Sequence, residues 1–166
     1  IKNLTDRGIN NLIVIGGDGS FRGMCDIERY TDVHCIGIPG TIDNDLAYTD
    51  YTIGFDTACK VYSELIGNIQ RDANSAKKYW HFIRLMGRSA SHIALECALQ
   101  SQPNICLISE EVEAKDMTLN DIVEQIVEVI VDRANAGLNF GTVLIPEGLI
   151  EFIPAMRVLI QESNDM

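Results

Sequence analysis

The stretch LIVIGGDGS, residues 12–20, decides the fold, because four apolar residues run straight into a glycine-rich turn. The run Leu12–Ile15 is short and mostly β-branched, which is typical of a buried strand. Glycines lack a β-carbon, so the backbone amides of this turn can approach phosphate oxygens, and the start of a helix adds partial positive charge. A helical stretch with Phe21, Met24 and Cys25 follows. A plain strand-to-helix turn without a ligand is the alternative interpretation.

Four further short apolar runs predict buried strands: His34–Ile38, His81–Met86, Ile105–Ser109 and Thr142–Ile145. Between them, apolar residues recur at intervals of three and four, which predicts helices over residues 55–69, 89–100 and 119–134. Strands that alternate with helices indicate parallel strands joined by right-handed crossovers. We therefore expect an α/β fold, a layered parallel sheet with helices on both faces.

The helix over residues 119–134 carries the clearest end signals. Thr118 with Asp121 is a capping-box pattern, and Gly137 stands where a C-cap is expected. The chain of 166 residues has no internal repeat or linker, so we expect residues 1–166 to form a single segment. Ile1 begins within a helical pattern, and Glu151–Met166 predicts a helix without an obvious partner, so we expect this segment to be cut from a longer chain.

Composition excludes several classes of function. The net charge of −11 argues against a nucleic-acid partner, because phosphate backbones are held mainly by Lys and Arg. No apolar run approaches the roughly 18 residues of a membrane span, and no signal-peptide pattern opens the sequence. The five cysteines are odd in number and form no CxxC pair, which favours reduced core thiols in a cytoplasmic protein over a disulfide framework or a zinc site.

A second loop, PGTIDND at residues 39–45, also follows a strand and carries two carboxylates. Asp43 and Asp45 stand at alternate positions of an extended segment, so their side chains point the same way. Such a pair can divide the work, one as general base toward a hydroxyl and the other as a metal or orienting group. Phosphoryl transfer to a sugar needs both roles. A solvated acidic turn is the alternative.

Four motifs, in this order, resemble the phosphofructokinase family: GGDGS at residues 16–20, PGTIDND at 39–45, TDYTIGFDTA at 49–58 and MGR at 86–88. The resemblance extends from Gly8 to about Ile160. It implies a phosphofructokinase-like fold and a 6-phosphofructokinase of glycolysis. Such an enzyme transfers a phosphoryl group from ATP to the 1-hydroxyl of fructose 6-phosphate with Mg²⁺. A cytoplasmic homo-oligomer without nucleic-acid or membrane partners is the implied assembly.

The resemblance also implies a role for each matching residue. Asp43 would take the proton from the sugar hydroxyl, with Thr41 and Ile42 binding substrate nearby and Asp45 helping to organise the metal. Asp18 would be the magnesium-associated carboxylate. The phosphoryl donor would be lined by Gly17, Asp18, Gly19, Ser20 and Gly23, and fructose 6-phosphate would contact Met86, Gly87, Arg88 and Glu147.

Several of these residues have plainer interpretations. Arg88 is expected to stabilise charge on the moving phosphoryl group, but it could be a surface charge, and Glu147 could simply cap the last helix. His81 and His92 are expected to be packing or surface residues, because no nucleophile accompanies them. Tyr79 follows Lys77 and Lys78 where short ATP-dependent members of the family commonly carry an arginine, so that role is not transferred.

Within the family that the sequence resembles, two small residues distinguish members that use ATP as the phosphoryl donor from members that use pyrophosphate. Gly19 and Gly40 match the ATP-dependent pattern, whereas the pyrophosphate-dependent pattern carries Asp and Lys at these positions. An Asp at 19 would occupy space that the α-phosphate of a nucleotide needs, so we expect ATP. The sequence beyond about Ala58 instead resembles the long, mostly pyrophosphate-dependent branch, which keeps a pyrophosphate-dependent phosphotransferase as the alternative. A regulatory subunit or binding module without catalysis is a further alternative.

Overall fold

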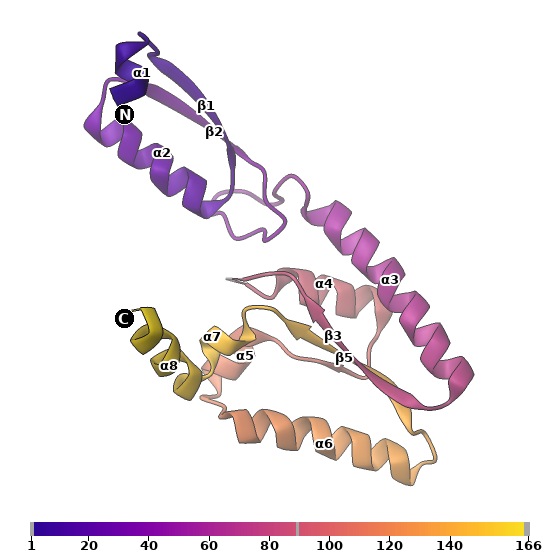
Figure 1. Ribbon diagram of the computed structural model, residues 1–166. Helices are drawn as coiled ribbons and strands as arrows, with labels where there is room; N and C mark the ends of the chain where they lie inside the picture. Colours follow the sequence, from indigo (N-terminus) through magenta and orange to yellow (C-terminus); the bar gives the residue numbers. More distant parts are fainter. Residues whose placement is uncertain (1, 89, 165–166) are drawn as a thin grey trace. The chain divides into compact units, whose positions relative to one another are not determined.

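The computed structural model describes residues 2–88 and 90–164, which form two compact units, Ile1–Asp56 and Thr57–Met166 (Figure 1). In the first unit the described elements are α1 (Lys2–Asp6), β1 (Asn11–Gly16), α2 (Asp18–Tyr30) and β2 (His34–Pro39). Strands β1 and β2 pair in parallel, with Ile13 opposite Ile36 and Gly16 opposite Pro39. The two strands expected here are therefore confirmed.

The glycine-rich turn is shorter than the sequence pattern indicates. Helix α2 begins at Asp18, with Gly17 as its N-cap, so Gly19 and Ser20 already belong to the helix. The helix lies against one face of the β1–β2 pair, where a β-carbon at Gly37 would come within 2.8 Å of the Phe21 ring. On the other face Ile13, Ile15 and Ile36 are 64%, 70% and 66% exposed. The first unit thus has a thin apolar core.

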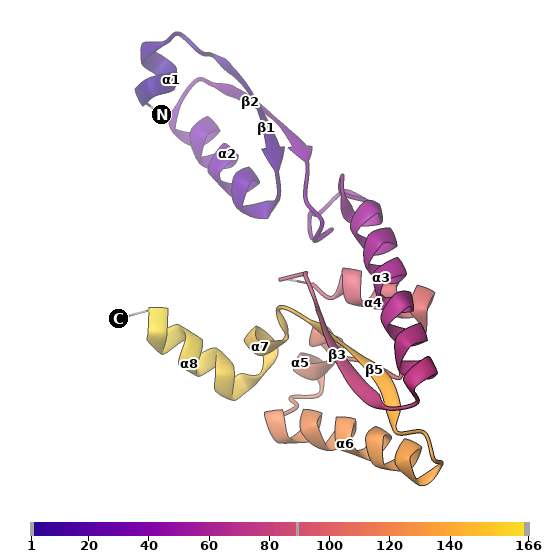
Figure 2. The same cartoon turned by 45° about the vertical axis from the view of Figure 1, so that its right-hand side comes forward.

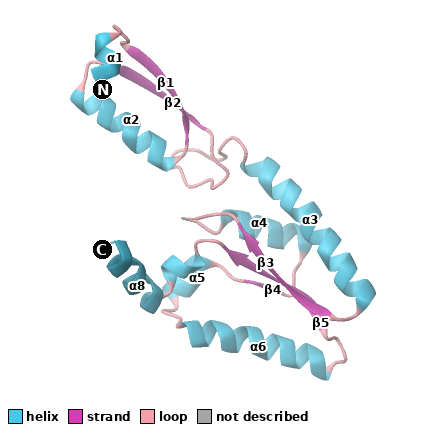
Figure 3. Cartoon of the chain, viewed as in Figure 1, coloured by secondary structure: helices cyan, strands magenta, loops and turns pink. Residues whose placement is uncertain are grey.

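The second unit is built on a three-stranded sheet (Figure 3). Helix α3 (Phe55–Ala76) enters it from the end of the first unit. The other described elements are β3 (Tyr79–Leu85), α4 (His92–Ser101), β4 (Ile105–Cys106), α5 (Ser109–Ala114), α6 (Leu119–Asn135), β5 (Phe140–Pro146), α7 (Leu149–Phe152) and α8 (Pro154–Asn164). The strands are parallel in the order β3-β5-β4, so the last strand in sequence is central.

Helices cover both faces of this sheet. Successive side chains of β5 point to opposite faces, so burying all of them requires a cover on each face. Val143 is fully buried in a cluster with Ile122 of α6 and Ile105 of β4. Its neighbour Thr142 points to the opposite face, where Gln70 Nε2 of α3 donates to Thr142 Oγ1 at 3.2 Å. In two views α6 lies on one side of the sheet, and α3 and α4 lie on the other (Figure 2). The expected α/β fold with helices on both faces is confirmed.

The ends of α6 match the sequence prediction. The Asp121 N–H donates to Thr118 Oγ1 at 3.3 Å, and the Thr118 N–H donates to Asp121 Oδ2 at 2.7 Å. The Thr118 hydroxyl also donates to Asp121 Oδ2 at 2.7 Å, and the two bonds that this carboxylate accepts, first from the Thr118 N–H and then from its hydroxyl, lower the pKa of Asp121. Gly137, just beyond the C-cap residue Ala136, has a φ of +77°, a conformation that glycine adopts without strain.

Other boundaries differ from the prediction. Strand β4 ends at Cys106. Ser109, which was expected to close that strand, instead begins α5. Helix α4 begins at His92; Ser89, where it was expected to start, lies outside the described residues. The segment expected as one terminal helix forms two, α7 and α8, separated at Ile153, whose ψ of 120° suits a residue that precedes proline.

The five cysteines are free thiols. Cys59 and Cys97 are buried, but Cys25 is exposed, so its expected core position is wrong. Burial, with a smaller contribution from Cys97 and Glu111, raises the pKa of Cys106 to about 11. None of the helices in the described ranges is both long and apolar enough to cross a membrane.

Truncation of Leu144 tests the central position of β5. Leu144 is fully buried and pairs with Ile83 on one side and Cys106 on the other. We expect Leu144→Ala to lower the free energy of unfolding by about 2–5 kcal/mol, because it leaves a cavity between the central strand and the helices on the face to which Thr142 also points. Leu159→Ala, at a position 58% exposed, is the control and should change it by less than about 0.5 kcal/mol. Urea unfolding followed by Trp80 fluorescence measures both, and equal effects would contradict this packing.

Candidate functional site

The two glycine-containing loops of the first unit lie against each other. The Gly40 N–H donates to the Gly16 carbonyl at 3.1 Å, just beyond the last paired residues of β1 and β2. A β-carbon at Gly17 would lie 3.1 Å from Thr41 Cβ, so the first loop passes close to the second only because residue 17 lacks a side chain. The structure therefore brings the predicted donor residue Gly17 next to the predicted substrate residue Thr41.

Asp18 is the first residue of helix α2, and its carboxylate forms an ion pair with an arginine on the same helix. Arg22 Nε lies 2.9 Å from Asp18 Oδ2, and the two side chains are 79% and 47% exposed. A cavity of about 560 Å³ separates this end of α2 from the loop after β2, and both Asp18 and Leu46 line it. Asp18 and the residue that follows Asp45 thus face the same hollow. Gly19, Ser20 and Gly23 follow within α2, and a β-carbon at Gly19 or Gly23 would meet nothing within 4 Å.

The loop from Gly40 to Gly54 is folded back on itself around the predicted base. The Asp43 N–H donates to Thr41 Oγ1 at 3.3 Å, and Ile42 contacts Gly54, where a β-carbon would lie 3.5 Å from Ile42 Cγ2. Asn44 has a φ of +52°, so the chain turns sharply between the two carboxylates, and the extended segment expected over Asp43–Asp45 is wrong. Asp45 Oδ1 is buried without a hydrogen-bond partner among the described residues, which leaves an acceptor available to a cation or a donor group.

The carboxylates do not form a closed metal centre. Across residues 2–88 and 90–164, no group of three or more His, Cys, Asp or Glu side chains could hold a metal ion. Mg²⁺ in phosphoryl-transfer sites commonly takes one or two protein carboxylates and completes its shell with phosphate oxygens and water. The unpaired oxygen of Asp45 and the exposed carboxylate of Asp18 fit such an open site, and their metal role stays a prediction.

In the second unit, the segments after β3 and β5 are joined through their backbones. The Glu147 N–H donates to the Leu85 carbonyl at 2.8 Å, and the Gly148 N–H donates to the Gly87 carbonyl at 3.1 Å. A β-carbon at Gly148 would overlap the Arg88 carbonyl oxygen. Gly87 has a φ of +126°, which favours glycine. The predicted sugar-phosphate residues Met86, Gly87, Arg88 and Glu147 therefore gather at one end of the sheet.

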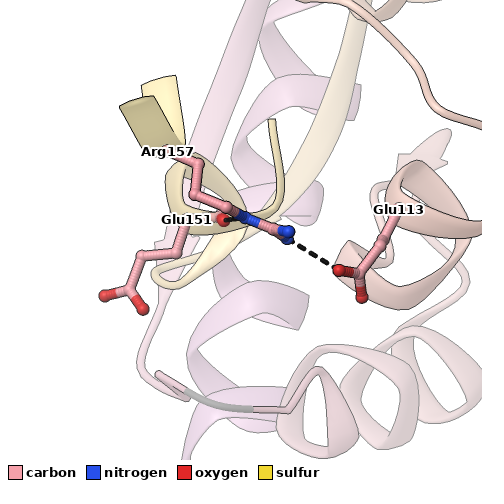
Figure 4. A network of polar contacts seen from close by, with 3 residues as sticks. All are labelled: Glu113, Glu151 and Arg157. Carbon is pink, nitrogen blue, oxygen red and sulfur yellow. Dashed lines mark hydrogen bonds and ion pairs between the residues drawn. The ribbon is translucent and has the colours of Figure 1, made fainter. Parts of the chain in front are cut away.

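Arg88 belongs to a chain of exposed charges. Its Nε lies 3.3 Å from Glu151 Oε1, and the two side chains are 77% and 44% exposed. Figure 4 shows how Arg157 continues the chain: it donates to the Glu151 carbonyl at 3.0 Å and to Glu113 Oε1 at 2.7 Å. An exposed ion pair of this kind is worth roughly 0–1 kcal/mol, so Arg88 can leave Glu151 for a phosphate at little cost.

A polar network of two buried serines and the exposed Glu110 lies just beyond the segment that carries Arg88. The Ser91 N–H donates to Glu110 Oε1 at 2.9 Å, and Ser91 Oγ accepts from the Ser109 N–H at 2.9 Å. Partial burial of the Glu110 carboxyl favours its neutral form, but the hydrogen bonds, chiefly from the Ser91 N–H, prevail and lower the pKa of Glu110. Neither Glu110 nor Ser91 was expected from the sequence motifs. The partners come from different strand ends and share no motif.

The structure also shows where Tyr79, His81 and His92, which lie outside the main motifs, are placed. Tyr79 begins β3, whereas Arg88 follows the opposite end of that strand, about 20 Å away for a strand of this length. Lys78 Nζ lies 4.9 Å from the centre of the Tyr79 ring. His92 is exposed, and His81 Nε2 is buried without a partner among the described residues.

Comparisons with known proteins agree on one family. The sequence matches the family model for phosphofructokinase over residues 1–164. It is 59% identical to a pyrophosphate–fructose 6-phosphate 1-phosphotransferase of Porphyromonas gingivalis, over 98% of this chain and 31% of that protein. The protein of the same name from Entamoeba histolytica is 54% identical over 99% of this chain and 32% of its own length. The beta subunit from Ricinus communis is 52% identical over 95% of this chain and 30% of its own length.

Solved structures show the same fold at lower identity. Phosphofructokinase from Saccharomyces cerevisiae superposes with a TM-score of 0.71 at 23% identity, covering 97% of this chain and 24% of that one. A pyrophosphate-dependent phosphofructokinase from Marinobacter aquaeolei gives 0.70 at 23% identity, covering 99% and 44%. The chain spans about a third of the length of its curated relatives. Their names specify pyrophosphate, so they do not support the expected ATP donor.

Substitution of Gly148 tests the join between the two strand ends. We expect Gly148→Ala to lower the free energy of unfolding by about 1–3 kcal/mol, because its β-carbon displaces the Arg88 carbonyl. Gly67→Ala on α3 is the control: a β-carbon there meets nothing within 4 Å, and alanine favours helix by up to about 1 kcal/mol. Urea unfolding compares the two, and a Gly148→Ala protein as stable as the unmodified one would contradict the close approach.

Proposed function

Because the chain belongs to the phosphofructokinase family, we propose that the protein of which it forms part transfers a phosphoryl group from pyrophosphate to the 1-hydroxyl of fructose 6-phosphate. The observation that carries this proposal is the 59% identity with a pyrophosphate-dependent relative across nearly the whole chain. Both loops that bear the candidate carboxylates lie within the matched residues. Several plant relatives are named as subunits, which supports an oligomer, and we extend that proposal to this protein.

Asp43 is the proposed general base. Phosphoryl transfer has a loose transition state, so catalysis consists largely of orienting the sugar hydroxyl and stabilising charge on the transferred group. A carboxylate within hydrogen-bonding reach of the hydroxyl orients it and accepts its proton as the new P–O bond forms. The bond from the Asp43 N–H to Thr41 Oγ1 keeps the backbone of this residue beside Thr41, which we propose contacts the same substrate.

The first loop is the proposed donor site. Gly17 caps α2, and the free N–H groups at the start of that helix suit phosphate oxygens. Asp18 and Asp45 would hold Mg²⁺, which when bound neutralises charge on the phosphates. In the second unit Arg88 and Glu147 would bind the sugar phosphate, the arginine by its charge and the glutamate by accepting hydrogen bonds from sugar hydroxyls.

ATP is a second candidate donor, favoured by the two glycines. A β-carbon at Gly19 meets nothing within 4 Å, so the space beside it is open to a larger donor. A β-carbon at Gly40 would lie 2.9 Å from Ile15 Cγ2, so a lysine at this position requires Ile15 to move. The pyrophosphate-dependent pattern therefore does not fit residue 40 without adjustment.

A donor comparison on the full-length protein separates the two candidates. We expect kcat/KM for pyrophosphate to exceed that for ATP by about a hundredfold or more, equivalent to about 2.7 kcal/mol. Gly19→Asp should reduce any ATP-dependent rate at least about tenfold and leave the pyrophosphate-dependent rate within about threefold, because the new carboxylate occupies space that only the nucleotide needs. A preference for ATP in the unmodified protein would establish the second candidate.

Removal of the Asp43 carboxylate tests the base. In the full-length protein, Asp43→Asn should lower kcat by about 10²–10⁴-fold while KM for fructose 6-phosphate stays within about threefold. Asp50→Asn, an exposed position in the same loop, is the matched control and should keep kcat within about twofold. Steady-state kinetics measures both. Near-normal turnover of the Asp43→Asn protein would remove Asp43 as the base.

A further inference from the structure

Thr52 is one of only three buried residues in the described part of the first unit, residues 2–56, together with Val33 and Phe55. Its side chain is polar, and the residue is only 4% exposed. A buried hydroxyl is retained where it makes hydrogen bonds that the backbone needs, since an unpaired polar group in such a place is costly. The contacts of Thr52 therefore indicate what it does.

Thr52 reaches the loop on both sides of the proposed base. Its Oγ1 donates to the Thr41 carbonyl at 2.6 Å, and its N–H donates to Asn44 Oδ1 at 2.8 Å. Residues 41 and 44 enclose Asp43 at separations of two and one. The backbone that carries Asp43 is thus tied at both ends to a single residue.

Neighbouring contacts extend this clamp. Asn44 Nδ2 donates to the Asp50 carbonyl at 3.2 Å, and the Ile53 N–H donates to the Pro39 carbonyl at 2.8 Å. Asn44 keeps a φ of +52°, which asparagine tolerates better than most residues. These hydrogen bonds join residues 39–45 to residues 50–53 and hold the loop in place.

We propose that Thr52 is a positioning residue for the transfer reaction: by binding the Thr41 carbonyl and the Asn44 side chain it sets the direction of the Asp43 carboxylate. This inference rests on the proposed function of Asp43. Thr52 is not required to touch substrate, because its hydroxyl is already committed to the Thr41 carbonyl. Misplacement of a catalytic group by about 1 Å can reduce rate about a hundredfold, so the loss of this bond should appear in turnover rather than in binding.

The test uses Thr52→Val in the full-length protein, which keeps the shape of the side chain and removes the hydroxyl. We expect kcat to fall by about 10–100-fold, with KM for both substrates within about threefold. Thr52→Ser keeps the hydroxyl and should restore kcat to within about threefold of the unmodified protein. Amide hydrogen exchange of residues 40–45 should speed up about tenfold in Thr52→Val, a readout that needs no activity.

Thr31→Val is the matched control. Thr31 lies in the same unit at the end of α2, where its Oγ1 donates to the Ile27 carbonyl at 2.6 Å and accepts from the Val33 N–H at 3.2 Å. This variant loses two hydrogen bonds away from the loop, so it is at least as disruptive locally as Thr52→Val, yet it should leave kcat within about twofold and exchange of residues 40–45 unchanged.

The outcomes separate the two proposals. If the unmodified protein transfers no phosphoryl group from either donor, the proposed function fails, and unchanged exchange in Thr52→Val would overturn the clamp as well. If the unmodified protein is active and Thr52→Val keeps kcat within about threefold, the positioning role is overturned while that of Asp43 stands. Equal losses of kcat in Thr52→Val and Thr31→Val would show general destabilisation and also overturn it.

Discussion

Backbone hydrogen bonding at the ends of parallel strands is the constraint on which the candidate site depends. Where β1 and β2 stop, their last polar groups need new partners, and the Gly40 N–H finds the Gly16 carbonyl. Where β3 and β5 stop, Gly148 finds Gly87 in the same way. Each pairing draws two loops together that are distant in sequence, and each requires glycine or a tight turn. The side chains that are proposed to act on phosphate belong to these paired loops.

Polar anchoring takes different forms in the two units. In the first, packing against the β1–β2 pair is thin, and the buried hydroxyl of Thr52 holds the second loop. In the second, a fully buried Val143 and the helices on both faces provide a core, and Ser91 with Glu110 fastens the Arg88 segment to the start of α5. Buried hydrogen bonds specify one loop conformation more sharply than apolar contacts do, because geometry and partner are both defined.

The donor question shows how local residues and whole-chain similarity can point in different directions. Gly19 leaves open space beside the first loop, as a nucleotide would need, and Gly40 sits too near Ile15 for an unadjusted lysine. The relatives with 50–59% identity are nevertheless named for pyrophosphate. Steric room permits a large donor but does not exclude a small one, so the open space at Gly19 is compatible with both. Identity across nearly the whole chain therefore weighs more in the proposal.

Sequence alone determined the alternation of strands and helices, the parallel α/β class, the Thr118–Asp121 cap and the strand ends where ligands are expected, because each depends on residues close together in the chain. The sequence-based prediction misjudged where α2 begins and treated the last segment as one helix, although Pro154 disfavours helical backbone at Ile153. Only the tertiary structure showed that β5 is central, that Thr52 binds residues 41 and 44, and that Glu110 supports Ser91. Those contacts join residues separated by up to dozens of positions, and no local pattern records which distant backbone group a buried hydroxyl or carboxylate will meet.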